Sequence, residues 1–296
     1  MEPWILITFA AAAFQTVRFL LQKRLSAERL TAAGAPFSRF IYSFPAAFLI
    51  AITYQSISQQ AWPALTVSFW SYALIGGISQ ILATVFTVML LNRRNFAVGI
   101  TFKKTEVILS VIVGIAVLGD TISFAALGAI LLGLMGVLLL SRNAIGGGFD
   151  KGAVALGLAS GLLFAFSGVG YRAATLAIAS DDPFLRASVA LSMVTLSQAI
   201  VMALYLRWRE VGEITRVLKT WRSASLIGLT SLGGSLSWFT AFTLQTVGLV
   251  KAVGQIELIL SILVGRLIFG EHLSKREAIG IATIGASVVA LVLISS

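Results

Sequence analysis

The chain of 296 residues contains no cysteine and a single histidine, His272. Without cysteine it can form no disulfide, no thiolate metal site and no cysteine nucleophile. One histidine cannot build a histidine-based metal cluster, and its place in a predicted loop excludes a Ser-His-Asp set at membrane depth. We therefore expect no metal site, no cofactor and no catalytic residues, so the chain is not predicted to be an enzyme.

Phosphate-binding and nucleic-acid-binding patterns are also missing. No Gly-Lys-Ser/Thr loop that could cradle a phosphate is present, so the chain is not expected to hydrolyse ATP. The formal net charge is +10, but the basic residues fall in short loops and at the ends of apolar runs, without a basic tail. This distribution is typical of membrane topology rather than of nucleic-acid binding.

Charge is scarce and apolar residues dominate. Charged residues make up 11% of the chain and hydrophobic residues 58%, whereas soluble domains are about a quarter charged. Ten apolar runs have roughly the length that crosses a bilayer as a helix. Their approximate ranges are Trp4–Leu21, Gly34–Tyr54, Phe69–Leu91, Val98–Leu118, Ser123–Leu140, Gly152–Tyr171, Phe184–Leu206, Ala224–Thr246, Leu249–Phe269 and Ala278–Ile294.

The apolar runs are continuous, which favours helices over a membrane barrel. The predicted fold is therefore all-α and integral to the membrane, with ten transmembrane helices. Very short connections at Asn92–Ala97 and Val247–Gly248 predict that spans 3 and 4 pair, as do spans 8 and 9.

One stretch occurs twice. Thr105–Ser123 and Ile256–Ser274 align without gaps at an offset of 151 residues, and both contain a glutamate (Glu106 and Glu257) in the sequence Glu-x-Ile-Leu-Ser. The polar, glycine-rich segment 141–151 lies between the two copies. We infer two five-helix repeats, residues 1–145 and 146–296. Because each has an odd number of spans, the two should be inverted in the membrane, the plan of many secondary transporters.

The lysine and arginine residues predict an orientation. Fourteen of them lie in or beside connections that follow odd-numbered spans, whereas connections after even-numbered spans have little beyond Arg172 and Arg186. By the positive-inside rule, the basic connections are cytoplasmic. Both termini are then expected outside, in a multi-pass protein of a cell membrane, such as a bacterial inner membrane.

The ends of the two repeats resemble the drug/metabolite transporter superfamily, specifically its EamA-type repeat. The residues that carry the resemblance are Gly119-Asp120-Thr121-Ile122-Ser123 with Gly128, Gly133 and Gly136, then Gly270-Glu271-His272-Leu273-Ser274 with Gly280 and Gly285, and the arginines Arg39 and Arg186. The resemblance covers nearly the whole chain. It implies a ten-helix transporter of small metabolites, with export the commoner role. Two features depart from the family: neither fourth helix contains a proline, and members usually have cytoplasmic termini.

Glu106 and Glu257 are the first candidates for a substrate-binding cavity wall, because a carboxylate within an apolar run is costly and usually faces a cavity or a partner. Lys103 precedes Glu106 by three residues, a spacing that permits an ion pair on one helix face. Gln15 lies deep in span 1 and requires a polar partner or cavity water. A buried pair that only fixes helix packing is the alternative.

Span 9 presents polar residues on two predicted faces. Lys251 and Gln255 share one face, while Glu257 shares another with Ser261, and the sequence does not indicate which face meets the cavity. Trp238 is the other candidate of note: it lies at mid-span and aligns with Phe86 at an offset of 152 residues. These two aromatic residues could line the cavity or pack ordinarily.

The first hypothesis is a secondary active transmembrane transporter that exports small organic metabolites, such as amino acids, by alternating access. It would lie in the lipid bilayer and bind a small-molecule substrate, with a coupling proton or counter-substrate as a further partner. The alternatives are a flippase for a lipid-linked intermediate and a membrane-embedded lipid-modifying enzyme. The oligomeric state is not indicated.

Overall fold

The computed structural model describes residues 2–25, 30–31, 33–91, 102–141, 151–269 and 274–295, and in these ranges the regular structure is helical throughout. The helices of the first half are α1 (Pro3–Leu25), α2 (Gly34–Ile57), α3 (Val67–Leu91), α5 (Glu106–Leu118) and α6 (Phe124–Ser141). Those of the second half are α7 (Lys151–Leu176), α8 (Pro183–Arg209), α9 (Glu213–Lys219), α10 (Trp221–Leu244), α11 (Val247–Val253), α12 (Ile256–Phe269) and α13 (Lys275–Ser295).

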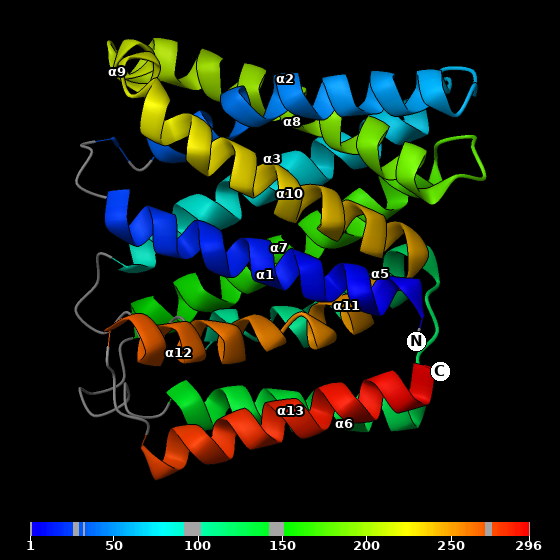
Figure 1. The fold of residues 1–296 in the computed structure, drawn as a ribbon, viewed down its shortest axis with the longest axis vertical. Helices are drawn as coiled ribbons and strands as arrows, with labels where there is room; N and C mark the ends of the chain where they lie inside the picture. Colours follow the sequence, from blue (N-terminus) through cyan, green and yellow to red (C-terminus); the bar gives the residue numbers. More distant parts are fainter. Residues whose placement is uncertain are drawn as a thin grey trace.

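The helices lie alongside one another, and both chain termini are at the same end of the molecule (Figure 1). Five helices are long and apolar enough to cross a membrane: α2, the stretch Val67–Thr87 of α3, α7, α8 and α13. Each of the ten predicted spans overlaps a helix. The histidine His272, the second Gly-Glu marker at residues 270–271, the connection 92–97 and the central residues 142–150 lie outside the described residues.

Two of the predicted spans are discontinuous. The ninth is divided into α11 and α12 by a turn at Gly254 and Gln255. In the first half, Phe102 and Lys103 are helical, a turn follows at residues 104–105, and α5 then begins at Glu106. The two breaks occupy nearly equivalent places in the repeat, although neither contains the proline that would explain a kink.

Helix packing occurs mainly between the two halves. The most extensive contacts join α3 with α7, α6 with α13, α1 with α10 and α2 with α8. In the two repeats α1 corresponds to α7, α2 to α8, α3 to α10 and α6 to α13. The α1–α10 contact is therefore the counterpart of the α7–α3 contact, and the α2–α8 and α6–α13 contacts each join two corresponding helices. The short connections predicted that spans 3 and 4 pair, but within the described chain α3 packs chiefly on α7 instead.

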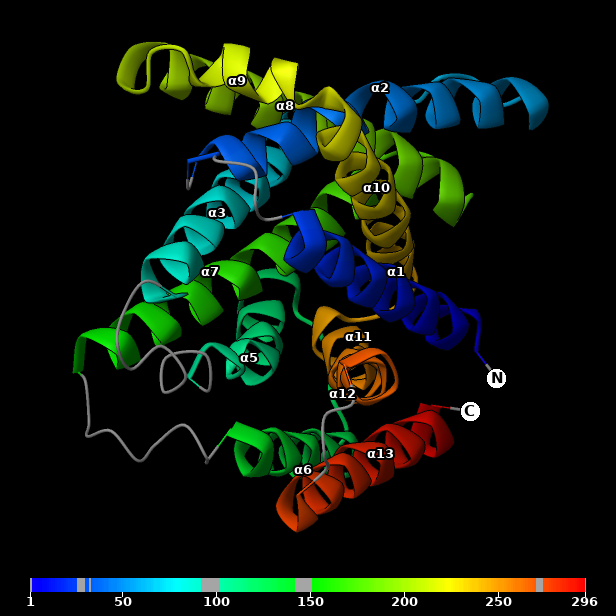
Figure 2. The same ribbon diagram turned by 60° about the vertical axis from the view of Figure 1, so that its left-hand side comes forward.

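The last helix of each repeat packs on the other, away from most of the bundle. Helices α6 and α13 lie side by side in both views (Figures 1 and 2). A Cβ atom placed on Gly136 would lie 2.9 Å from the backbone oxygen of Gly280, so glycine permits this close approach. A Cβ on Gly128 or Gly285 would meet nothing within 4 Å. Close helix packing therefore requires glycine at Gly136 and Gly280 but not at Gly128 or Gly285.

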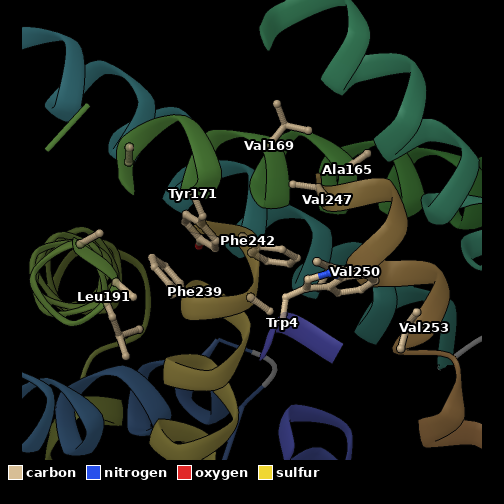
Figure 3. Packing of buried hydrophobic residues seen from close by; sticks show 14 of the residues in the cluster. Trp4, Ala165, Val169, Tyr171, Leu191, Phe239, Phe242, Val247, Val250 and Val253 are labelled. Carbon is tan, nitrogen blue, oxygen red and sulfur yellow. The ribbon is translucent and has the colours of Figure 1, made fainter. Parts of the chain in front are cut away.

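The main buried cluster is built from both halves, and part of it is shown in Figure 3. The rings of Tyr171 in α7 and Phe239 in α10 are stacked there, with centroids 4.5 Å apart. Helix α5 ends at Gly119, whose φ of +67° is left-handed and whose N–H donates to the backbone oxygens of Gly114 and Ile115. Glycine tolerates this conformation, so Gly119 ends the helix.

Candidate functional site

A cavity of about 340 Å³ lies among α1, α2, α3, α7, α10, α11 and the residues at the start of α5. Both halves contribute to its wall. At one end it reaches Ala35 and Pro36 in the first turn of α2, and Ala35 is exposed. Its volume is within the range of small-molecule binding sites.

The two helix breaks place carboxylates beside this cavity. Glu106 is the first residue of α5, and Glu257 is the second residue of α12. At the second break the N–H of Gln255 bonds to the oxygen of Ala252 and that of Glu257 to the oxygen of Gly254, a three-residue spacing that tightens the turn. The N-terminal turn of a helix has unpaired N–H groups and a positive dipole end, which favour a carboxylate. The breaks thus offset part of the cost of these buried charges.

Glu106 forms an ion pair with a lysine of the other half. Its Oε1 atom is 3.5 Å from Nζ of Lys251 in α11. Aromatic rings surround the lysine: Nζ is 5.5 Å from the ring centre of Trp238 and 5.9 Å from that of Phe164. Lys103 lies 4.6 Å from the same Phe164 ring. These distances suit cation–π attraction, so the rings hold both ammonium groups against the cavity wall.

Glu257 is linked to the cavity through a glutamine. Nε2 of Gln15 in α1 donates to Oε2 of Glu257, and Nε1 of Trp238 donates to Oε1 of Gln15 over 3.3 Å. Gln15 therefore uses its amide to join α12 to α10, and its own side chain faces the cavity. Three residues proposed from sequence are brought together here, although Gln15 is more than 200 positions from both Glu257 and Trp238 along the chain.

A second polar cluster lies in another part of the cavity, around Gln80 of α3. Its Oε1 atom accepts hydrogen bonds from Nη2 of Arg39 at 3.2 Å, the hydroxyl of Tyr171 at 3.0 Å and Nε2 of Gln198 at 2.9 Å. Gln198 also donates to the backbone oxygen of Gly77. The cluster joins α2, α3, α7 and α8, and it fixes the residues around Arg39.

The structure places the seven residues proposed from sequence in different surroundings. Gln15, Lys103, Glu106 and Trp238 line the cavity, and Glu257 contacts it only through Gln15. Gln255 and Phe86 are not among the lining residues.

Helix geometry explains the positions of Gln255 and Phe86. The break at Gly254 turns Gln255 away from Lys251, and its Oε1 atom lies 3.0 Å from the position a Cβ on Gly133 would take, in α6. On α3 the lining residues Gln80, Thr84 and Thr87 share one face at spacings of four and three. Phe86 lies about 100° from Thr87 around the helix and so belongs to another face.

Sequence reasoning missed several residues of the cavity. Arg18, Arg39, Gln80 and Tyr171 were not among the residues proposed from sequence, yet all four line it. A stripe of small and polar residues on α10, from Thr230 through Ser231, Gly234 and Ser235 to Trp238, also lines the wall. The spacing of this stripe was the signal that could have identified the α10 face.

Two polar clusters hold together the end of the molecule that carries the termini. Asp182 caps α8 by accepting from the N–H groups of Phe184 at 2.8 Å and Leu185 at 3.1 Å. Its other oxygen accepts from the Tyr54 hydroxyl at 2.7 Å and from Gln60 Nε2 at 3.2 Å. Burial raises the pKa of Asp182, but these hydrogen bonds outweigh burial and hold it below its usual range.

The second cluster centres on Arg172. Its Nη1 atom donates to the backbone oxygens of Phe242 at 2.7 Å and Gln245 at 2.5 Å, where α10 ends, and its Nε atom is 3.7 Å from Asp120 Oδ1. A cation suits the negative end of a helix. Burial raises the pKa of Asp120 above its usual value, and the Arg172 guanidinium offsets part of that rise.

Comparison with known proteins identifies a shared fold. No family model matches the chain, and no curated protein matches it. A solved structure, described only as "Crystal structure of protein", is similar over 99% of both chains, with a TM-score of 0.76 and 18% sequence identity. At this identity the likeness concerns the fold alone. Within the described ranges no three His, Cys, Asp or Glu side chains are grouped to hold a metal ion.

Proposed function

We propose that this protein is a secondary active transporter of small organic metabolites, with ten membrane spans in two inverted five-helix halves. One observation carries the proposal: a cavity between the halves is lined by charged side chains from both, beside two broken helices. Discontinuous helices near a repeat interface are the usual setting of a transporter's substrate site. Rocking of the halves about this cavity would give alternating access.

The orientation follows from the basic connections, which we place in the cytoplasm. The exposed start of α2, which the cavity reaches, is then at the cytoplasmic end. The Asp182 and Arg172 clusters close the opposite, outer end. The structure thus fits an inward-facing state ready to load a cytoplasmic metabolite, which supports export as the direction of transport.

The proposal is tested first in cells and then with the purified protein. Cells with and without the gene are exposed to a panel of metabolites, and the compound whose efflux or toxicity changes is taken into proteoliposomes. We expect saturable uptake and counterflow of that compound. We expect the Glu106→Gln variant to lower the rate at least about tenfold, the cost of one lost charged hydrogen bond. The control is Lys151→Met, because Lys151 is exposed at the start of α7.

Absence of protein-dependent flux for every metabolite that alters growth would contradict transport. If flux occurs but Glu106→Gln and Glu257→Gln both leave it unchanged, transport stands and these two residues are not part of the site.

A further inference from the structure

The charges in the cavity are unbalanced. Its described lining includes four basic side chains and one carboxylate, and a second carboxylate, Glu257, lies behind Gln15. The basic residues are Arg18, Arg39, Lys103 and Lys251, and the carboxylate is Glu106. Glu106 is paired with Lys251, so it is not the counter-ion of Arg39.

Arg39 has most of its hydrogen-bonding capacity unused. A guanidinium offers five N–H donors, yet within the described chain Arg39 makes one side-chain hydrogen bond, over 3.2 Å to Gln80 Oε1. That oxygen already accepts from Tyr171 and Gln198. None of the described carboxylates lies within ion-pair distance of Arg39. A half-buried guanidinium without a counter-ion suits a bound anion, which it can hold through two parallel N–H bonds.

The repeat supplies an internal comparison. Arg186 occupies the position in the second half that Arg39 occupies in the first, after Pro-Phe-x. Its Nε atom donates to the backbone oxygen of Thr175 at 2.9 Å and its Nη2 atom to that of Leu176 at 3.1 Å, at the end of α7. Arg186 thus has a structural role as a helix cap, whereas Arg39 faces the cavity.

Aromatic rings also line the cavity that Arg39 faces. Tyr171 and Phe239, which are stacked on each other, both line the cavity, as do Trp238 and Phe242, whose ring centres are 5.7 Å apart. Such a wall suits the apolar body of a small ligand. The cavity wall therefore contains both a guanidinium and several aromatic rings.

We infer that the substrate is a small organic anion, a carboxylate or a phosphate monoester with an apolar body, and that Arg39 binds its anionic group. The inference rests on the proposed function in taking this cavity as the substrate site. The aromatic side chains receive the apolar body, and the Glu106–Lys251 pair remains available to a second polar group of the same molecule.

The test uses purified full-length protein in detergent and four probes with a common phenyl ring: 3-phenylpropionate, 2-phenylethyl phosphate, 3-phenylpropylamine and 3-phenylpropanol. Binding is measured by calorimetry or by the shift of the unfolding midpoint. We expect at least one anion to bind more tightly than both the amine and the alcohol. This comparison within the wild-type protein does not depend on the folding of any variant. The carboxylate and phosphate probes distinguish the two anionic groups.

Variants then locate the anion. Arg39→Gln is expected to weaken anion binding about ten- to a hundredfold, the value of a hydrogen-bonded charge, with the alcohol affected less than twofold. Arg39→Lys keeps the positive charge but loses the paired N–H groups of the guanidinium, so an intermediate loss of anion affinity is expected. Arg186→Gln is the matched control. It is expected to lower thermal stability without changing the preference for the anion.

The inference is overturned if the amine binds more tightly than both anions, if no anion binds, or if Arg39→Gln retains the anion preference within twofold. These outcomes are separate from the test of transport. Anion binding without flux in proteoliposomes would refute transport but retain the anion site. Flux of a cation that is unaffected by Arg39→Gln would support transport and refute the anion site.

Discussion

Glu106 and Lys251 form an ion pair that joins the two halves of the protein, with Oε1 and Nζ 3.5 Å apart and both side chains largely buried. Glu106 begins α5 in the first half, and Lys251 is in α11 of the second. Sequence spacing had suggested Lys103 as the partner. The pairing places a contact between opposite charges at the two helix breaks, where the proposed rocking of the halves would act.

Removing one member of this pair should destabilise the protein. Glu106→Gln leaves Lys251 without its counter-charge, and Lys251→Met leaves the carboxylate unpaired. Each is expected to cost about 1–3 kcal/mol, the penalty for an unsatisfied buried group. The double variant should cost less than the sum of the two, since neither charge is then stranded. Thermal unfolding midpoints in one detergent provide the measurement, with Lys151→Met as the control. Strict additivity of the single effects would show that the pair has no energetic coupling.

The Asp182 cluster should make stability depend on acidic pH. Because the folded-state pKa of Asp182 lies below its usual value, its contribution is fully present above the unfolded pKa of about 3.9 and is lost as pH falls through the folded pKa. Asp182→Asn keeps a capping side chain but has no titration. The difference in stability between wild type and this variant should be constant from pH 7 to about pH 5 and shrink below about pH 4.

Loss of the cap itself is tested separately at neutral pH. Asp182→Ala should cost about 1 kcal/mol or more at pH 7, since the N-cap bonds are removed too. The adjacent Asp181 is exposed, so Asp181→Asn is the control. An Asp182→Ala variant as stable as the control would contradict the observed capping role.

Two glycines of α6 should respond in opposite ways to alanine. A Cβ at Gly136 would lie 2.8 Å from Ile284 Cγ1 and 2.9 Å from the Gly280 oxygen, so Gly136→Ala must separate α6 from α13. We expect a loss of about 1–3 kcal/mol from overpacking. Gly128→Ala meets nothing within 4 Å and should be neutral or stabilise the protein by up to about 1 kcal/mol. The thermal unfolding midpoints of the two variants, compared with that of the wild type, test this difference. Equal effects would argue against close α6–α13 packing.

The orientation in the membrane can be tested with reporters. A phosphatase that is active only outside the cytoplasm, fused after Ser296, should be active. The same reporter inserted between α9 and α10, at Thr220, should be inactive, because Arg216, Lys219 and Arg222 mark that connection as cytoplasmic. The opposite pair of results would reverse the proposed orientation, and with it the inward-facing interpretation of the cavity.

Helix positions could be predicted from sequence because long apolar runs are strong and local signals. The predicted run Gly34–Tyr54 corresponds to α2 (Gly34–Ile57), and Phe184–Leu206 to α8 (Pro183–Arg209). The carboxylates Glu106 and Glu257 could be identified as exceptional for the same reason, since their cost in an apolar run does not depend on tertiary structure.

The partners of these residues could not be predicted. Ideal helix geometry placed Lys251 and Gln255 on one face, but the break at Gly254 separates them, and no proline marks it. Arg39 and Arg186 illustrate the same limit, because the repeat predicts equivalent positions for them. Arg186 reaches a backbone carbonyl of α7, whereas Arg39 reaches Gln80 of α3 at the cavity, and the sequence around each arginine does not show which neighbour it meets.

Interlocking of the halves has a consequence for biosynthesis. Every described helix of residues 3–141 has its most extensive contacts with a helix of residues 151–295. On the proposed topology, when the ribosome has released only the first half, these helices would lie in the bilayer without the surfaces that later cover them. Gln80 then lacks Tyr171 and Gln198, and Glu106 lacks Lys251. Newly made first halves should therefore be substrates for membrane proteases until the second half arrives, and two separately expressed halves should protect one another from degradation.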